Sequence, residues 1–223
     1  MSRFFPRLSL IALLVLSPFA SAQELSAIEE KALVTKLQQQ RAQMPAITAS
    51  FTEEKTTRLL KKPIVSSGTL AFQAPNRFRR DLTGNNPSTT VCNGQELWIH
   101  YPNMQAAEKY TLGQKQFFDD SIAALTAGLN FQDVERFFQV KAIREGANYR
   151  IILTPKRGGL RRILEGLTVL LDGDGIIQQT DAILPKGDRV TTTYRNVRAA
   201  KQSDAKFEFT PPAGVNVSTP LGK

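Results

Sequence analysis

Side chains that could do chemistry are scarce in this sequence. His100 is the only histidine and Cys92 is the only cysteine among 223 residues. A cysteine nucleophile needs a histidine base within hydrogen-bonding reach and a third group that orients this base, so both residues would have to meet. Each also has a structural explanation, Cys92 as a small buried strand residue and His100 as a structural or solvent-facing one. The sequence therefore favours a protein that is not an enzyme.

Two glycine-containing motifs could be mistaken for a metal site or a phosphate site. Asp172-Gly173-Asp174-Gly175 resembles the start of a calcium loop, but such a loop needs glycine at its sixth position and a bidentate glutamate at its twelfth. Ile177 and Ile183 occupy these positions. Gly158-Gly159 lacks the glycine spacing and the following Lys-Ser/Thr of a phosphate loop. We expect a hairpin turn at 172–175, no metal and no cofactor.

The first 22 residues have the pattern of a secretory signal peptide. Two arginines precede an apolar run from Leu8 to Leu16, and Ala20-Ser21-Ala22 makes a small-residue cleavage site. The apolar run is shorter than the ~20 residues that a membrane-spanning helix needs. We therefore predict cleavage after Ala22 and export of one domain, residues 23–223. A single cysteine allows no intramolecular disulfide, so burial and sheet hydrogen bonds must stabilise this domain.

The chain is basic, with a formal net charge of +9 that falls to +7 if Arg3 and Arg7 leave with the signal peptide. The charges are scattered, and the tightest groups are Lys61-Lys62 and Arg161-Arg162. The sequence lacks the basic stripe with stacking aromatic residues that is typical of nucleic-acid-binding proteins, so we expect no nucleic-acid partner. The positive charge favours an anionic membrane or an acidic docking patch.

Apolar spacing predicts one helix followed by a series of short strands. Apolar residues recur at three- and four-residue steps from Leu25 to Leu37, which predicts an amphipathic helix that ends near Pro45. Alternation then begins at Ile47, and Asn93-Gly94 predicts a tight hairpin with a type I′ turn. Helical spacing returns in 117–138, where we expect two short helices. The predicted strands begin at Ile47 and cover 65–73, 77–82, 89–92, 96–101, 106–112, 139–144, 149–154, 167–172, 176–184 and 189–197.

Ten or more antiparallel strands in succession favour a curled sheet, because open twisted sheets rarely grow beyond ~10 strands without curling. The three predicted helices can bury their apolar faces against the inner surface of such a sheet. The sequence thus predicts a mainly β fold, an incomplete (half-open) antiparallel β-barrel of about eleven strands whose helices form a lid.

Several short motifs resemble the LolA-type outer-membrane lipoprotein carriers, in order from about Ile47 to Val215. No single motif is decisive, but their order and spacing together are specific to this family. The motifs are Phe51-Thr52, Gly68-Thr69-Leu70, Pro75-Asn76-Arg77-Phe78-Arg79, Asn93-Gly94-Gln95-Glu96-Leu97-Trp98, Tyr101-Pro102, Leu153-Thr154-Pro155-Lys156 and the stretch 205–215.

This resemblance implies a monomeric periplasmic carrier whose half-open barrel holds the acyl chains of a lipoprotein. It implies that the carrier accepts cargo from an inner-membrane ABC-type lipoprotein release complex and delivers it to an outer-membrane lipoprotein receptor. The lid would bury its apolar residues either on the sheet or on the cargo. The residues expected to line the lipid-binding cavity are Phe51, Leu70, Phe72, Phe78, Arg80, Leu82 and Trp98 on strands, and Phe117, Phe118, Ile122 and Leu125 on the lid.

Two positions depart from the family pattern. An arginine that helps to govern lid opening in the family is replaced by Ala74, and Arg80 stands where an aromatic residue is common. A charge beside apolar surface is costly unless it is paired. We therefore expect Arg80 to meet an acidic group of the ligand, or to bond a lid carbonyl, Asp119 or Asp120. The alternative is that a local bulge turns Arg80 towards solvent.

Two other functions stay open at this point. Ala74 favours a LolA-like carrier of a different lipid, such as a glycolipid or an aryl-polyene lipid. A periplasmic lipid-binding sensor has a similar half-barrel, but such proteins usually carry an additional domain for which this chain has no spare length.

Overall fold

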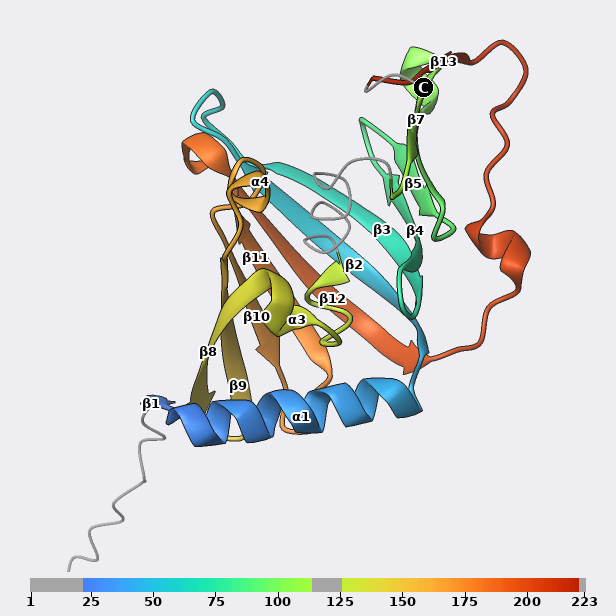
Figure 1. Cartoon of the computed structure of the whole chain (residues 1–223). Helices are drawn as coiled ribbons and strands as arrows, with labels where there is room; N and C mark the ends of the chain where they lie inside the picture. The colour runs from blue at the N-terminus through green and yellow to red at the C-terminus, as the bar shows by residue number, and fades with distance from the viewer. Residues whose placement is uncertain (1–21, 114–125, 221–223) are drawn as a thin grey trace, which may run out of the picture.

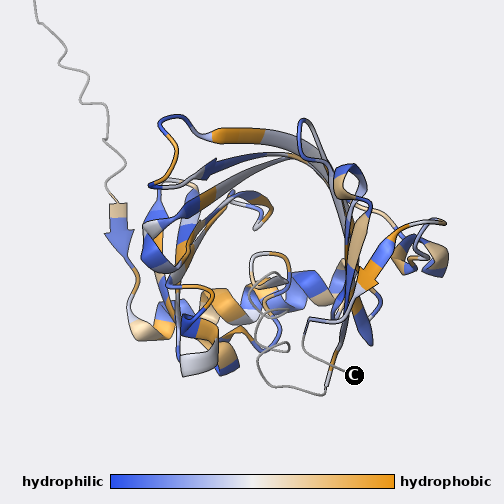
Figure 2. Ribbon diagram, turned by 90° about the horizontal axis from the view of Figure 1, so that it is seen from above, coloured by the Kyte–Doolittle hydropathy of each residue, from blue (hydrophilic) through white to orange (hydrophobic). Residues whose placement is uncertain are grey.

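A computed structural model describes residues 22–113 and 126–220 of the chain (Figure 1). Thirteen strands form one sheet in the order β1-β8-β9-β10-β11-β12-β2-β3-β4-β5-β6-β7-β13, with β1 and β13 at its two unpaired edges. The sheet curves strongly but does not close, as the view from above shows (Figure 2). The predicted half-open, mainly β fold is therefore confirmed.

All eleven predicted strands are present, with ends within two residues of most predicted bounds. The strands are β2 (Ala46–Thr56), β3 (Ile64–Gln73), β4 (Arg77–Thr83), β5 (Ser88–Cys92), β6 (Glu96–Tyr101), β7 (Ala106–Thr111), β8 (Phe138–Glu145), β9 (Asn148–Pro155), β10 (Gly166–Leu171), β11 (Ile177–Ile183) and β12 (Arg189–Ala199). Consecutive strands in this series pair antiparallel except β7 and β8, and β12 pairs antiparallel with β2.

Two further strands, β1 (Ala22–Glu24) and β13 (Asn216–Ser218), were not predicted. Strand β1 pairs antiparallel with β8, whereas β13 pairs parallel with β7. Each has three residues, all exposed. A segment this short has no alternation that the sequence could reveal, so only its partner strand defines it.

Helix α1 (Ala27–Gln43) lies across one end of the sheet (Figure 1). Ser26 and Glu29 form a capping box at its N-terminus, which satisfies two backbone N–H groups that have no partner within the helix. At its other end the buried Arg41 donates a hydrogen bond of 3.1 Å to the carbonyl of Gly175, in the turn between β10 and β11. These contacts fix α1 against the strand ends.

The remaining helices are short. Of the region where two helices were predicted, the described part contains α3 (Val134–Phe137). Helix α4 (Gly158–Arg161) and the 3-10 turns η1 (Pro102–Met104), η2 (Pro185–Gly187) and η3 (Asp204–Phe207) carry too little periodicity to be predicted. The predicted lid residues Phe117, Phe118, Ile122 and Leu125, together with Asp119 and Asp120, lie outside the described residues, as does most of the predicted signal peptide.

The predicted hairpin at Asn93-Gly94 forms, but its turn is not type I′. Gly94 has a φ of +95°, whereas Asn93 is not among the residues with positive φ, and the loop between β5 and β6 has three residues. The side-chain oxygen of Asn93 accepts hydrogen bonds from the backbone N–H groups of Gln95 and Glu96, at 2.9 and 2.8 Å. This local bonding lets asparagine shape the turn without positive φ.

The C-terminal segment crosses the convex face of β4–β7 before it reaches β13 (Figure 1). Phe207 is fully buried, and the Arg77 guanidinium lies 4.8 Å from its ring centroid. Arg77 also pairs with Asp204 at 2.8 Å. This segment therefore covers part of the outer face of the sheet.

Gly68 on β3 is required because the ring of Phe51 lies across it. The two residues are directly paired, and a methyl group added at Gly68 would overlap the Asp81 carbonyl oxygen and lie 2.6 Å from Phe51 Cζ. An aromatic ring that packs over a strand glycine covers backbone that would otherwise be exposed.

We predict that Gly68→Ala lowers the free energy of unfolding by about 1–3 kcal/mol through overpacking. Gly166→Ala on β10 is the matched control, since an added methyl group there meets nothing within 4 Å. Urea unfolding measures both variants. Equal losses in the two would contradict the close packing of Phe51 on Gly68.

Candidate functional site

The concave face of the sheet carries most of the predicted cavity residues. Strand register places Phe51 opposite Gly68, Leu70 opposite Arg80, and Phe72 opposite Phe78, so these side chains share one face. Phe51, Leu70, Phe72 and Phe78 are all at most 5% exposed and belong to one apolar cluster, against which the half-buried Leu82 packs. These five side chains make this part of the face largely apolar.

Trp98 does not join this face, which corrects the expectation that it lines the cavity. Trp98 pairs with Val91 on β5, whereas its neighbour Leu97 pairs with Cys92 on the concave side. Successive strand residues point to opposite faces, so Trp98 points to the convex side. There its ring centroid lies 5.5 Å from that of Phe209 in the C-terminal segment.

Leu97 is one of the concave residues that sequence reasoning missed. It is 4% exposed and belongs to the apolar cluster. The three-residue loop at 93–95 fixes the pairing of Cys92 with Leu97, and a two-residue turn would not give the same pairing. Such a turn would pair Leu97 with Thr90, which pairs with Arg80, and would leave Leu97 on the same face. Alternation along β6 was therefore the signal that could have found Leu97.

Residues 126–131 occupy the concavity, between α1 and the sheet. Leu129 and Phe131 are buried in the same cluster as the concave face. Gly128 lies so close to the sheet that an added methyl group would come within 2.7 Å of Thr180 Cγ2. We call this segment, residues 126–131, the plug.

Two side-chain hydrogen bonds join the plug to the wall and to α1. Asn130 Nδ2 donates to the carbonyl of Pro75 at 3.1 Å, in the turn between β3 and β4. Gln38 Nε2 on α1 donates to the carbonyl of Phe131 at 3.2 Å. The plug therefore bridges α1 and the β3–β4 turn.

A cavity of about 720 Å³ lies beside the plug. Its walls are the β3–β4 turn, the β5–β6 turn, the end of β7 and the stretch 126–138. Small-molecule sites commonly have volumes of about 300–1,000 Å³. The plug residues Thr126, Ala127 and Asn130 form part of its lining.

Comparison with known proteins identifies the family. The sequence pattern described as "Outer membrane lipoprotein carrier protein LolA" matches residues 42–210, which is most of the chain. This chain belongs to the LolA family. An outer-membrane lipoprotein carrier protein from Methylibium petroleiphilum is 31% identical over 76% of this chain and 80% of its own length. One from Dechloromonas aromatica is 29% identical over 77% and 80%. A LolA superfamily protein from Nitrosomonas europaea, of known structure, superposes with a TM-score of 0.45 at 8% identity over 81% of this chain and 97% of its own.

Ala74 is one of the two positions where this chain departs from the LolA family pattern. Ala74 is partly buried and packs against the apolar cluster. The residue after it, Pro75, accepts the hydrogen bond from Asn130. In this LolA-family chain, Asn130 of the plug therefore donates the hydrogen bond that joins the plug to the β3–β4 turn.

Arg80 lies on the concave face of this LolA-family barrel, and no bulge interrupts its strand. β4 pairs with β3 and β5 in unbroken register across Arg80, so the bulge alternative is wrong. Its guanidinium pairs with Glu53 and lies 4.3 Å from the ring centroid of Phe51. Tyr194 stands beside them, 6.5 Å from Phe51 between ring centroids, and burial raises the pKa of its phenol. These residues form a polar island on the concave face.

The two nucleophile candidates are apart. Cys92 is buried on the concave side, where burial raises the pKa of its thiol to about 11 and keeps it protonated at neutral pH. His100 shares the convex face with Trp98, and its ring centroid lies 5.3 Å from that of Phe209. The two side chains therefore cannot act together. Within residues 22–113 and 126–220, no group of three or more His, Cys, Asp and Glu residues could hold a metal ion.

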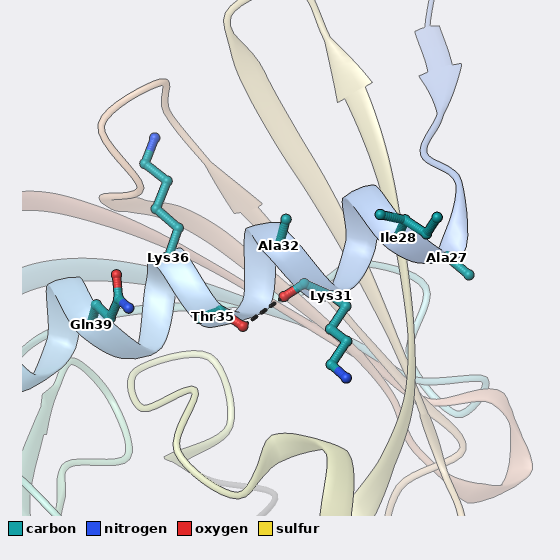
Figure 3. A pocket seen from close by; sticks show the side chains of 7 residues that line it. All are labelled: Ala27, Ile28, Lys31, Ala32, Thr35, Lys36 and Gln39. Atoms are coloured by element: carbon teal, nitrogen blue, oxygen red, sulfur yellow. Dashed lines mark hydrogen bonds between the residues drawn. The ribbon is translucent and has the colours of Figure 1, made fainter.

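A second hollow, on the outside of α1, does not make a binding site. Its lining residues all come from this one helix, among them Ile28, Lys31 and Lys36 (Figure 3). With no second wall, the hollow cannot enclose a ligand.

In the described part of the chain no helix has the length and apolar character to cross a bilayer.

We predict that Asn130→Ala lowers the free energy of unfolding by about 1–3 kcal/mol, because it leaves the Pro75 carbonyl without this partner. Hydrogen exchange at the Leu129 amide should accelerate in parallel. Asn103→Ala is the control, since Asn103 also donates to a backbone carbonyl, at 3.0 Å, but on the exposed surface. A similar loss in Asn103→Ala would contradict a special role for the plug contact.

We also predict that Arg80→Leu destabilises the protein by about 1–3 kcal/mol, because it leaves the Glu53 carboxylate, only 16% exposed, without its partner. The double variant Arg80→Leu/Glu53→Leu should recover most of this loss. Urea unfolding of the two single variants and the double variant gives the coupling free energy. Additive losses would show that the ion pair contributes nothing.

Proposed function

We propose that this chain is a periplasmic carrier that binds the acyl chains of lipoproteins and shuttles them from the inner to the outer membrane. The observation that carries the proposal is the concave apolar face, covered by α1 and a bonded plug, in a member of a family of lipoprotein carriers. The signal peptide, cleaved after Ala22, would deliver the chain to the periplasm.

Cargo binding on this face follows from the hydrophobic effect. Each buried CH₂ group is worth about 0.8 kcal/mol, so acyl chains cross water only if the carrier offers comparable burial. The concave residues already bury their side chains against Leu129 and Phe131 of the plug. Acyl chains would take the place of the plug, so that loading replaces one set of apolar contacts with another. Such an exchange keeps the net affinity moderate and permits release.

The carrier would need a donor and an acceptor. We propose an inner-membrane ABC-type lipoprotein release complex as the donor and an outer-membrane lipoprotein receptor as the acceptor. We expect the carrier to act as a monomer, because one curved sheet of one chain forms the whole concave face.

A second candidate cargo is a different lipid, such as a glycolipid or an aryl-polyene lipid. The polar island of Arg80, Glu53 and Tyr194 favours it, because a polar group on the lipid could bond there without leaving a buried charge unpaired. Native mass spectrometry of protein purified from the periplasm distinguishes the two cargoes. A co-purified triacylated protein supports the lipoprotein route, and a free lipid supports the alternative.

Photo-crosslinking tests where the acyl chains bind. A benzoylphenylalanine placed at Phe72 or Phe78 should crosslink a synthetic triacylated lipopeptide, because both positions face the concavity. The same residue at Trp98, an aromatic position on the convex face, is the matched control and should give only background. Circular dichroism verifies that each variant is folded.

Two outcomes would contradict the proposal. If Trp98 labels as strongly as Phe72 and Phe78, the acyl chains do not bind in the concavity. If the unmodified protein does not bind the lipopeptide at all, the lipoprotein cargo itself is wrong.

A further inference from the structure

Large apolar side chains are exposed mainly at one end of the sheet. Of the eight that are exposed within residues 22–113 and 126–220, five lie there: Leu59 (91% exposed), Leu60, Ile64, Val65 and Ile183. Four belong to the connection between β2 and β3 and the start of β3, and the fifth ends β11. The side chain of Leu59 is therefore almost wholly in water.

Strand pairing brings three connections together at this end. Thr56 at the end of β2 pairs with Arg189 at the start of β12, which in turn pairs with Ile183. Ile183 also pairs with Gly166, at the start of β10 after the connection that contains α4. We call the connections 57–63, 156–165 and 184–188 together the basic rim. Figure 1 shows it at the end of the sheet opposite α1.

The connections of the basic rim also touch through their side chains. A methyl group added at Gly187, in the β11–β12 connection, would lie 3.0 Å from Arg58 Nη2 of the β2–β3 connection. Arg58 therefore packs directly on the neighbouring turn. The contact holds the two turns beside each other as one surface.

Positive charge predominates on the basic rim. It carries eight Lys and Arg residues against two Asp and Glu residues, whereas the whole chain carries a formal net charge of only +9. Lys61, Lys62 and Arg162 are exposed beside the apolar tip, and so is Lys186 on the neighbouring turn. The two pairs Lys61-Lys62 and Arg161-Arg162, far apart in the sequence, thus belong to one surface.

We propose that the basic rim is a docking surface for the face of a bilayer that contains anionic phospholipids. Exposed leucine and isoleucine next to lysine and arginine match the two parts of such a surface, the acyl boundary and the anionic headgroups. The tip of the β2–β3 connection projects as a convex apolar point rather than a groove. A soft bilayer interface can accommodate this shape, whereas a protein partner would need a preformed pocket for it.

The position of the basic rim gives the docking an orientation. Because α1 covers the opposite end of the sheet, a chain docked through the rim would hold α1 away from the membrane (Figure 1). The proposal does not depend on the identity of the cargo, since the side chains that would touch the membrane, Leu59, Leu60, Lys61 and Lys62, are exposed and do not belong to the apolar cluster of the concave face.

Cosedimentation of the cargo-free exported chain with vesicles tests the proposal. Binding should be strong to vesicles of phosphatidylcholine with phosphatidylglycerol, weak to phosphatidylcholine alone, and reduced by high salt. Lys61→Gln/Lys62→Gln should weaken binding about 10- to 30-fold, since each basic residue near an anionic surface contributes a factor of about five. Leu59→Ser/Leu60→Ser should weaken it by at least about tenfold through the lost apolar insertion.

Matched controls come from the exposed face of α1. Lys31→Gln/Lys36→Gln removes two exposed lysines at the opposite end, and Ile28→Ser removes an apolar side chain that is 84% exposed. Both should bind vesicles within about twofold of the unchanged protein, since exposed substitutions at a non-contacting end alter little.

Three results would overturn the docking surface: no binding to anionic vesicles, equal binding to neutral vesicles, or an equal loss in the α1 controls. Because the assay contains no lipoprotein, its failure would leave the proposed carrier function intact. Failure of the lipopeptide crosslinking would likewise leave the docking surface intact.

Discussion

An apolar concave sheet face cannot be left in water, and most of this structure follows from that constraint. Side chains of α1, the plug and the sheet form one continuous buried cluster. Burying a side chain such as Leu37 or Phe131 contributes roughly 1.5–3 kcal/mol, which is why a helix and a plug with few other contacts stay in place. The same constraint makes the covering exchangeable, because any apolar body that fits the concavity can replace it.

The unclosed sheet creates a second requirement, which is to protect its edges. An edge strand presents unpaired N–H and C=O groups that can pair with another chain. The three-residue strands β1 and β13 occupy the two edges, and the C-terminal segment that leads to β13 also packs Phe207 and Phe209 on the convex face. The two short edge strands thus leave few unpaired backbone groups at the edges of the unclosed sheet, which limits pairing with another chain.

The polar island interrupts the apolar part of the concave face formed by β2, β3 and β4. The ion pair with Glu53 and the contact with the Phe51 ring offset the cost of placing the Arg80 charge beside apolar surface. Such a partly buried pair adds little net stability over apolar residues, but it sets where polarity lies on the concave face. It is therefore placed to select among lipids that differ in their polar groups.

The sequence by itself determined the strand series, helix α1, the half-open fold class and most of the concave residues. Alternation of period two and the turns between strands are local properties, so Phe51, Leu70, Phe72 and Phe78 could be assigned to one face. Only the tertiary structure decided the partner of Arg80, the two short edge strands and the position of Lys61-Lys62 and Arg161-Arg162 on one surface. Each of these depends on pairing between distant segments, and a shift of one residue in register moves a side chain to the opposite face of the sheet.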